Sequence, residues 1–218
     1  MKVDFHAHLP ESIDVPADEL LKTIPAGTQI FVCATQAADI GRLRDLRLLA
    51  RERNIGLQIA YGLHPWFVKD DFKSQIQIIR QALIEDPEAQ VGEIGLDKCR
   101  ENFEAQVEAF TLQLSLAGTL NRQATVHCVR AWNEILQILN KPQHRATALH
   151  FHRFSGNAQI AKKLLSRDGN VIFSFLEKDL KNPSRKLQEV LNLVPAQKIF
   201  PESDSPLAPA SKSAGGKS

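Results

Sequence analysis

Two histidines near the start of the chain have the spacing of metal ligands. His6 and His8 lie at positions i and i+2 of the segment DFHAHL, 4–9. Side chains two residues apart on a strand point the same way, so one cation could contact both imidazoles. Imidazole nitrogen suits Zn, Mn or Fe. A pair of hydrogen-bonded histidines facing the core is the alternative, because an isolated H-x-H pair is not specific.

Further along, single residues that could bind a metal or move a proton come where short apolar segments end. A buried carboxylate such as Glu93 is costly unless it is paired or bound to cations, and its two oxygens could bridge two of them. A buried arginine could satisfy Glu93 instead. Asp204 could bind metal and accept a proton from an attacking water. The remaining members of the set are His64, His127 and His152.

Three neighbours of these residues are expected to support the site rather than bind metal. His150 forms a second i, i+2 pair with His152 but lies deeper in its segment, so His152 is the predicted ligand. Glu202 is expected to orient a ligand. Asp97 is expected to orient a ligand or cap a helix, because we expect the chain to turn at Gly95.

These residues need a frame that brings distant segments to one face. Short segments rich in Val, Ile and Phe alternate with segments of helical period, which predicts a parallel sheet. The predicted strands are 2–6, 28–34, 57–62, 89–94, 124–128, 146–151, 170–175 and 197–201. Eight strands and the lack of a glycine-rich dinucleotide fingerprint favour an α/β fold of the (β/α)8 TIM-barrel type. The carboxyl ends of barrel strands meet at one face, where the ligands would gather.

Apolar stripes on the helical segments are predicted to cover this sheet. The stripes are Ile40, Leu43, Leu46 and Ala50; Ile76, Ile79 and Leu83; and Phe103, Val107, Phe110, Leu114 and Ala117.

Composition limits the class of protein. With 218 residues, 43% hydrophobic and 24% charged, the chain suits one globular domain. Its net charge of +2 gives no general attraction to nucleic acid or membrane.

We found neither a run of roughly 18 apolar residues nor a signal peptide, so no membrane partner is expected. Cys33, Cys99 and Cys128 are too widely spaced for a disulfide framework or zinc site, and the cytoplasm is the expected location.

Six stretches together resemble the TatD family of metal-dependent hydrolases, within the amidohydrolase-like barrels. They are DFHAHL at 4–9, GLHPW at 62–66, VGEIGLD at 91–97, VHCVRAW at 126–132, HRFSG at 152–156 and ESDSP at 202–206. They keep the order and approximate spacing of the family. The resemblance implies a TIM barrel that hydrolyses phosphodiesters with two divalent cations (Mg, Mn or Zn), typically as a deoxyribonuclease.

The resemblance also implies the roles of the site residues. The two ligand sets would be His6, His8, Glu93 and Asp204 for one cation, and Glu93, His127 and His152 for the other. Glu93 would bridge the cations, and Asp204 would act as the general base. His64 would stabilise charge on the phosphoryl oxygens, unless it is only a turn histidine before Pro65.

Four basic residues follow predicted strand ends and are expected to contact phosphates at the mouth of the site. They are Lys98, Arg100, Arg130 and Arg153. A solvated rim without a binding role is the alternative. DNA is the favoured substrate, and RNA and small phosphodiesters stay open.

The end of the chain departs from the family, whose members continue past ESDSP and close with a helix. Residues 207–218 are small and polar instead. We therefore expect a single domain over 1–206, a flexible polar tail over 207–218, and a barrel without its eighth helix. The uncovered groove would favour self-association and weaken activity.

Two other functions stay open at this point. An amidohydrolase or lactonase would share the H-x-H pair and the late aspartate, but often bridges its metals with a carboxylated lysine where Glu93 lies. Lys98 is expected beyond the turn, too far along the chain for that role. The third possibility is a shortened relative that binds metal or a partner without turnover, against which the intact ligand set argues.

Overall fold

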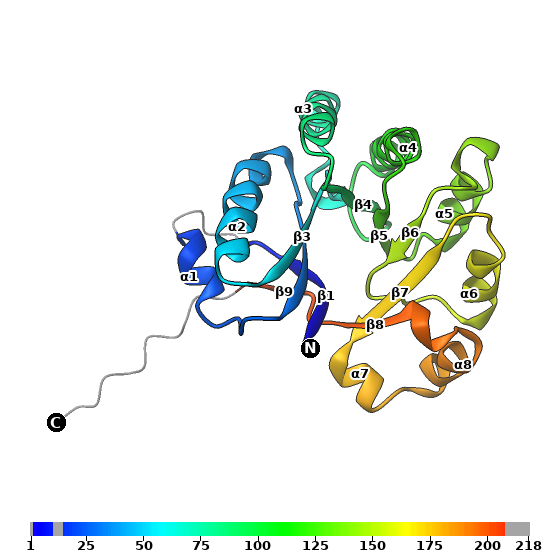
Figure 1. Ribbon diagram of the computed structural model, residues 1–218. Coiled ribbons are helices and arrows are strands. Elements are labelled where there is room, and N and C mark those ends of the chain that lie inside the picture. Colours follow the sequence, from blue (N-terminus) through cyan, green and yellow to red (C-terminus); the bar gives the residue numbers. More distant parts are fainter. Residues whose placement is uncertain (1, 11–14, 208–218) are drawn as a thin grey trace.

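The strands of the protein form one parallel sheet that curls into a barrel (Figure 1). The computed structural model describes residues 2–10 and 15–207. In chain order the strands are β1 (Val3–His8), β2 (Gln29–Cys33), β3 (Gly56–Tyr61), β4 (Gln90–Asp97), β5 (Ala124–Val129), β6 (Leu149–Phe151), β7 (Val171–Leu176), β8 (Ile199–Glu202) and β9 (Ser205–Pro206). Their order in the sheet is β8-β7-β6-β5-β4-β3-β2-β1-β9. Sequential neighbours thus lie side by side, which confirms the predicted TIM-barrel type of fold.

The barrel closes through the last described stretch of the chain. β8 pairs with β7, and β9 pairs with β1 at Ala7 and His8. Only Ser203 and Asp204 separate β8 from β9, and the Asp204 N–H donates to the His6 carbonyl at 3.0 Å. The two short strands are therefore one crossing segment that joins β7 to β1. β9 was not predicted, since two residues including a proline carry no strand signal.

Helices cover the outside of the barrel, as Figure 1 shows. The α-helices are α1 (Ala17–Leu21), α2 (Ile40–Glu52), α3 (Phe72–Glu85), α4 (Phe103–Leu120), α5 (Trp132–Leu139), α6 (Ala158–Leu165), α7 (Glu177–Lys181) and α8 (Arg185–Leu193). Short 3-10 helices are η1 (Ala37–Asp39), η2 (Pro65–Phe67), η3 (Pro142–His144) and η4 (Ala196–Lys198). Among the described residues, no helix is long and apolar enough to span a membrane.

The predicted apolar stripes agree with the helix faces that are buried. All four stripe residues of α2 and all three of α3 are buried. On α4 the stripe is buried at Phe110, Leu114 and Ala117, whereas Phe103 and Val107 are only partly buried. The periodicity of apolar residues was therefore a reliable guide to these elements.

Two strands end more than one residue beyond their predicted ends. β1 was predicted to end at His6 but extends to His8, so both histidines lie within the strand. β4 extends to Asp97, so the expected turn at Gly95 is wrong. A glycine inside a strand reads as a turn from sequence alone, but here it marks a close approach between strands.

The end of the described chain corrects one further expectation. Leu207 was assigned to a flexible tail, but its side chain is buried and its N–H donates to the His8 carbonyl at 2.8 Å. It belongs to the same hydrophobic cluster as Ala7. The other residues of that tail, and the expected absence of an eighth barrel helix, lie outside the described residues.

Aromatic rings fill the barrel interior beneath the site. Phe5 stacks on Phe200 with 3.9 Å between ring centroids, and its ring lies 5.4 Å from that of His150. The register of β1 against β2 shifts between Asp4 and Ala7. At this irregularity the adjacent residues Phe5 and His6 both make ring contacts: Phe5 stacks on Phe31, and His6 stacks on His152 with 4.1 Å between ring centroids.

Candidate metal centre

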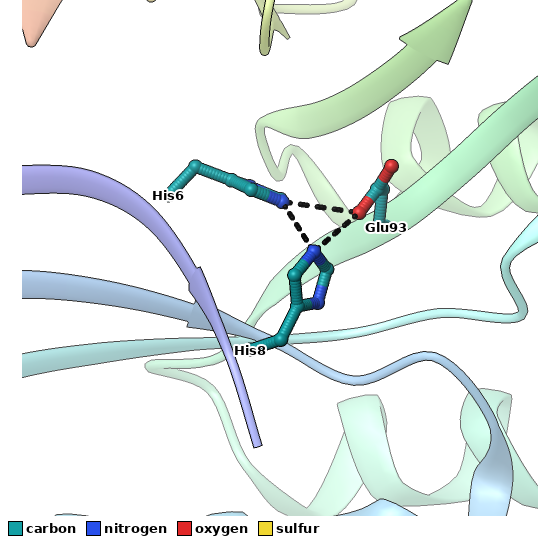
Figure 2. Close-up of side chains that lie close together, drawn as sticks. All are labelled: His6, His8 and Glu93. Atoms are coloured by element: carbon teal, nitrogen blue, oxygen red, sulfur yellow. Dashed lines mark hydrogen bonds and ion pairs between the residues drawn. The ribbon is translucent and has the colours of Figure 1, made fainter. Parts of the chain in front are cut away.

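The carboxylate of Glu93 lies at the centre of a cluster of histidines at the carboxyl ends of the strands. Its Oε2 lies 3.1 Å from His6 Nε2 and 3.4 Å from His8 Nε2. Figure 2 shows these two imidazoles of β1 converging on that oxygen, with 3.0 Å between their Nε2 atoms. The H-x-H pair thus faces one oxygen of a buried carboxylate.

The other oxygen of Glu93 faces a second set of imidazoles. Oε1 lies 2.7 Å from His152 Nε2, 2.8 Å from His127 Nδ1 and 3.2 Å from His64 Nε2. Each oxygen therefore points to its own group of nitrogens, an arrangement in which one carboxylate can bridge two cations.

Asp204 joins this cluster from the segment that closes the barrel. Its Oδ1 lies 3.4 Å from His8 Nε2, 3.7 Å from His6 Nε2 and 3.8 Å from His152 Nδ1. All six residues predicted as metal ligands thus meet in one place. His150, which was set aside, lies deeper, where its Nε2 is 2.6 Å from Ser174 Oγ.

The charges in the cluster suit a cation. Burial lowers the pKa of His6 to about 4 and also lowers the pKa values of His64 and His152, so these imidazoles are neutral at neutral pH. Burial alone would raise the pKa of Glu93, but the surrounding histidines outweigh it and hold that pKa well below the usual range. Burial would lower the pKa of His8 as well, but its hydrogen bond to Asp204 and the charge of Glu93 outweigh burial and raise that pKa. A buried anion beside the neutral imidazoles of His6 and His152 is a ready set of metal ligands.

Unsatisfied polar atoms support the same interpretation. Among the described residues, both oxygens of Glu93 are buried without a partner in hydrogen-bonding geometry, as are His8 Nδ1, His127 Nε2 and His152 Nδ1. Buried polar atoms without partners are rare in folded proteins and often mark an ion. Three overlapping groups have ligand atoms within 4.8 Å of one another: His6, His8 and Glu93; His6, His152 and Asp204; His64, Glu93 and His127.

A backbone hydrogen bond determines which nitrogen of His64 carries the proton. Its Nδ1 accepts the backbone N–H of Trp66 at 3.2 Å. In the neutral ring the proton is therefore on Nε2, the atom that faces Glu93. His64 thus presents an N–H donor to the cluster, which suits a carboxylate or phosphoryl oxygen better than a metal.

Gly95 allows β4 and β5 to approach closely enough to form the cluster. It has φ of +154°, and a Cβ at this position would lie 2.0 Å from the His127 carbonyl oxygen. No other residue type could adopt this backbone without moving His127 away from Glu93. Gly95, the second glycine of the GEIG segment, therefore allows His127 to reach Glu93.

Two glutamines of α4 hold the neighbouring strand ends, and sequence reasoning missed both. Gln113 accepts the N–H of Leu63 at 2.7 Å and donates to its carbonyl at 3.2 Å, next to His64. Gln106 makes the same pair of bonds to the backbone of Asp97. Both side chains are fully buried. A polar residue on a helix reads as exposed, so only their position on the buried stripe could have revealed them.

A cavity of about 880 Å³ opens above the cluster. Arg130 and Arg153 line it, and the Arg153 Nη1 lies 2.9 Å from Asp204 Oδ2. Lys98 instead pairs with Glu134 at 2.6 Å, and Arg100 stacks on Trp66, a lining residue. The four basic residues predicted for the rim are therefore divided between two at the cavity wall and two beside it.

Three residues at this rim have a positive backbone φ. Arg130, Arg153 and Asp204 all have φ between +39° and +54°, a region that side-chain-bearing residues rarely adopt. They lie within two residues of the ends of β5, β6 and β8, respectively. Strain of this kind persists where the surrounding structure imposes it, and it is typical of functional sites.

Comparison with known proteins agrees with this geometry. A family model described as TatD related DNase matches residues 3–217. The chain belongs to the TatD-related DNase family. An uncharacterised metal-dependent hydrolase of Methanocaldococcus jannaschii is 29% identical to this TatD-family protein over 208 residues, covering 94% of this chain and 78% of that protein.

Relatives with named activities match shorter parts. The 3'-5' RNA nuclease TATDN2 of Homo sapiens is 30% identical over 150 residues, which are 67% of this chain but 20% of the human protein. The 3'-5' ssDNA/RNA exonuclease TatD of Pantoea vagans is 29% identical over 148 residues, 66% of this chain and 56% of that enzyme.

Among solved structures, the TatD homologue YjjV of Escherichia coli has a TM-score of 0.77 at 25% identity, covering 93% of this chain and 78% of that one. These findings confirm the predicted family and fold, and the relatives are named as metal-dependent hydrolases and nucleases. The lactonase alternative is not favoured, because Glu93 occupies the bridging position and Lys98 is paired with Glu134.

Proposed function

We propose that this TatD-family protein uses two divalent cations to remove nucleotides from the ends of single-stranded DNA or RNA. The observation that carries the proposal is that the two oxygens of Glu93 face different histidines: Oε2 faces those of β1, and Oε1 faces His127 of β5 and His152, which follows β6. The nuclease activities named for the human and Pantoea vagans relatives support the substrate class.

The residues fit two cations that share one carboxylate. One would be held by His6, His8, Glu93 and Asp204, and the other by Glu93, His127 and His152. When bound, the cations would supply Lewis-acid activation of a water and of the phosphoryl group. The imidazole nitrogens favour Zn or Mn, and a phosphodiester substrate would also accept Mg.

The protein's own groups would handle the proton and the charge. Asp204 would take the proton of the attacking water: burial would raise its pKa, but His8 and the neighbouring His152 and His6 lower it to about 2, so it is ionised. His64 would donate its Nε2 proton as a hydrogen bond to a phosphoryl oxygen. Arg130 and Arg153 would contact phosphates at the cavity wall.

We also propose a cytoplasmic location. Cys33, Cys99 and Cys128 are all free thiols, which suits a reducing compartment. The expected tendency to self-associate stays a prediction.

Glu93→Gln tests the proposal, with Glu202→Gln as a matched control. Both glutamates are buried, but burial raises the pKa of Glu202 to about 8, so glutamine resembles the form it already has at neutral pH. After removal of metals and reloading with Mn, Zn or Mg, the wild type and Glu202→Gln are expected to hold two equivalents of metal. Glu93→Gln should hold at most one and lose activity on a labelled single-stranded oligonucleotide by about 100-fold or more.

Elemental analysis and cleavage assays measure the two effects separately. Only trace metal in the reloaded wild type, or equal metal content in both variants, would contradict the two-cation centre. Turnover of a lactone or amide but not of the oligonucleotide would contradict the substrate class.

A further inference from the structure

Trp66 is an aromatic ring held open to solvent at the edge of the metal centre. It lines the cavity, yet half of its side chain (50%) is exposed. The other large apolar side chains that are exposed in the described part of the chain are aliphatic: Leu48, Ile78, Ile84, Leu112 and Leu193. An exposed indole forgoes the stabilisation that its burial would provide, and exposed apolar surface of this kind often marks a binding site.

The ring is fixed rather than loosely placed. Its Nε1–H donates to Asp97 Oδ2 at 2.7 Å, and its backbone N–H donates to His64. Asp97 is itself held through its backbone by Gln106 of α4. The indole is therefore anchored along one edge to buried groups, and its position relative to His64 is set, with 5.1 Å between the ring centroids.

A guanidinium already stacks on this ring. The Arg100 Cζ lies 4.2 Å from the indole centroid. Arg100 is exposed, and within residues 2–10 and 15–207 no carboxylate lies at ion-pair distance from it. Burial would raise the pKa of Asp97, but hydrogen bonds from Trp66 and Cys99, helped by the charge of Arg100, outweigh burial and lower that pKa. An indole and a guanidinium plane are the two surfaces on which proteins stack unpaired nucleobases.

We propose that the Trp66–Arg100 pair is a nucleobase-stacking site that holds one base next to the reacting phosphate and makes the enzyme prefer unpaired ends. The inference rests on the proposed nuclease function and deepens it by naming the residues that select single strands. A base within a duplex is stacked on its neighbours and cannot reach the ring, whereas the base of a frayed or single-stranded end can. Stacking does not read the identity of the base, so all four bases would be accepted.

The test removes the ring from the protein and the base from the substrate. The variants are Trp66→Leu, Trp66→Phe and the control Trp132→Phe, which changes the other tryptophan of the chain. The substrates are a single-stranded oligonucleotide and the same strand with abasic residues at the end that is cleaved. For the wild type, loss of the base is expected to raise KM about 10-fold, the effect of one stacked base.

Trp66→Leu should raise KM for the intact strand by a similar factor, mainly without a change in kcat. The two losses should not add, because the ring and the base make the same contact. Trp66→Phe should keep most of the wild-type preference for the intact strand. If Trp66→Leu discriminates intact from abasic ends as strongly as the wild type does, the stacking site is wrong.

Fluorescence provides a readout that does not depend on cleavage. In a Trp132→Phe background, Trp66 is the remaining tryptophan, and metal-free protein cannot consume the strand. Titration with the intact oligonucleotide is expected to quench its emission, and the abasic strand is expected to quench it at least about 5-fold less at equal concentration. Equal quenching by both strands would overturn the inference. Clear discrimination without any metal-dependent cleavage would instead refute the proposed nuclease function and leave the stacking site standing.

Discussion

Asp204 combines a strained backbone with contacts to two different parts of the site. One carboxylate oxygen faces the imidazoles of His6 and His8, and the other accepts from Arg153. Its backbone N–H is bound to the first strand, so the side chain cannot easily move out of place. A group that is ionised, positioned and adjacent to the metal ligands is suited to remove a proton from water.

We therefore expect Asp204→Asn to lower kcat by about 10²–10⁴-fold, since the amide cannot accept the proton. Metal content should fall less than in Glu93→Gln, because the amide oxygen can still act as a ligand. Ser205→Ala, a neighbouring exposed position, serves as the control. Steady-state cleavage of an oligonucleotide and elemental analysis measure the two effects, and near-wild-type turnover in Asp204→Asn would assign the base elsewhere.

At the scale of elements, α4 does more than cover the sheet. Gln113 satisfies both backbone groups of Leu63, the residue before His64. Gln113→Leu would leave a buried N–H and a buried carbonyl without partners. We expect it to lower the free energy of unfolding by about 2–4 kcal/mol and, because His64 shifts, to lower kcat by about 10-fold or more. Urea unfolding and kinetics, with Ser115→Ala on the same helix as control, measure both effects; unchanged kcat would show that α4 does not position His64.

A second polar contact joins α2, β3 and α3 away from the metal centre. Asp86 accepts from Arg47 at 2.6 Å and from Tyr61 at 2.7 Å. Burial would raise the pKa of Asp86, but Arg47 and Tyr61 outweigh this effect and lower it. A carboxyl whose folded pKa is lowered contributes stability above its unfolded pKa of about 3.9. That contribution is lost as the pH falls through the folded value.

Asp86→Asn is therefore expected to lower the free energy of unfolding by about 1–3 kcal/mol at pH 7, with the difference from wild type shrinking as the pH falls below about 4. Urea unfolding at pH 7, 5, 4 and 3 measures this dependence. Glu88→Gln removes an exposed carboxylate that pairs with Arg47 and Arg51, and it should change the free energy of unfolding by less than about 1 kcal/mol. A difference between Asp86→Asn and wild type that stays constant with pH would contradict the pKa argument.

The whole molecule should be more stable with its metals than without them. The proposed ligands lie in β1, β4 and β5, directly after β6, and between β8 and β9, so a bound cation would connect strands from the whole barrel. A ligand that binds only the folded state at about 100 times its Kd adds about 2.7 kcal/mol. For a chain of this size that corresponds to a rise in Tm of about 5–10 °C. Thermal melts with Mn or Zn and with EDTA measure it, and a wild type whose Tm shifts no more than that of Glu93→Gln would contradict this coupling.

Local sequence patterns were enough to predict the type of fold and most residues of the candidate site. The apolar stripe from Ile40 to Ala50 and the alternation of strands with helices indicated the barrel, since burial imposes these periods on any sequence that adopts it. The positions of His6, Glu93 and Asp204 at strand ends indicated where they would meet. What sequence reasoning could not provide depends on contacts between distant segments.

The buried Gln113 illustrates that limit. A polar side chain on a helix is predicted to face solvent, and only its hydrogen bonds to Leu63 explain why Gln113 is buried. Gly95 reads as a turn, yet it lies within β4 against His127. Trp66 received no role from the sequence, because nothing local reveals that Asp97 and Arg100 hold it at the surface. Each case concerns a residue whose environment is created by another segment of the chain.

The segment from β8 to β9, which closes the barrel, affects the protein during its translation. His6 and Asp204 are 198 positions apart (204 − 6), yet the backbone of one binds the backbone of the other. At roughly 5–20 residues per second, a ribosome would need about 10–40 s to travel from one to the other. Throughout that time the nascent chain carries the H-x-H pair but neither the strand that completes the barrel nor Asp204, the proposed general base. We therefore expect a growing chain to be inert toward the nucleic acids around it until translation has passed Asp204.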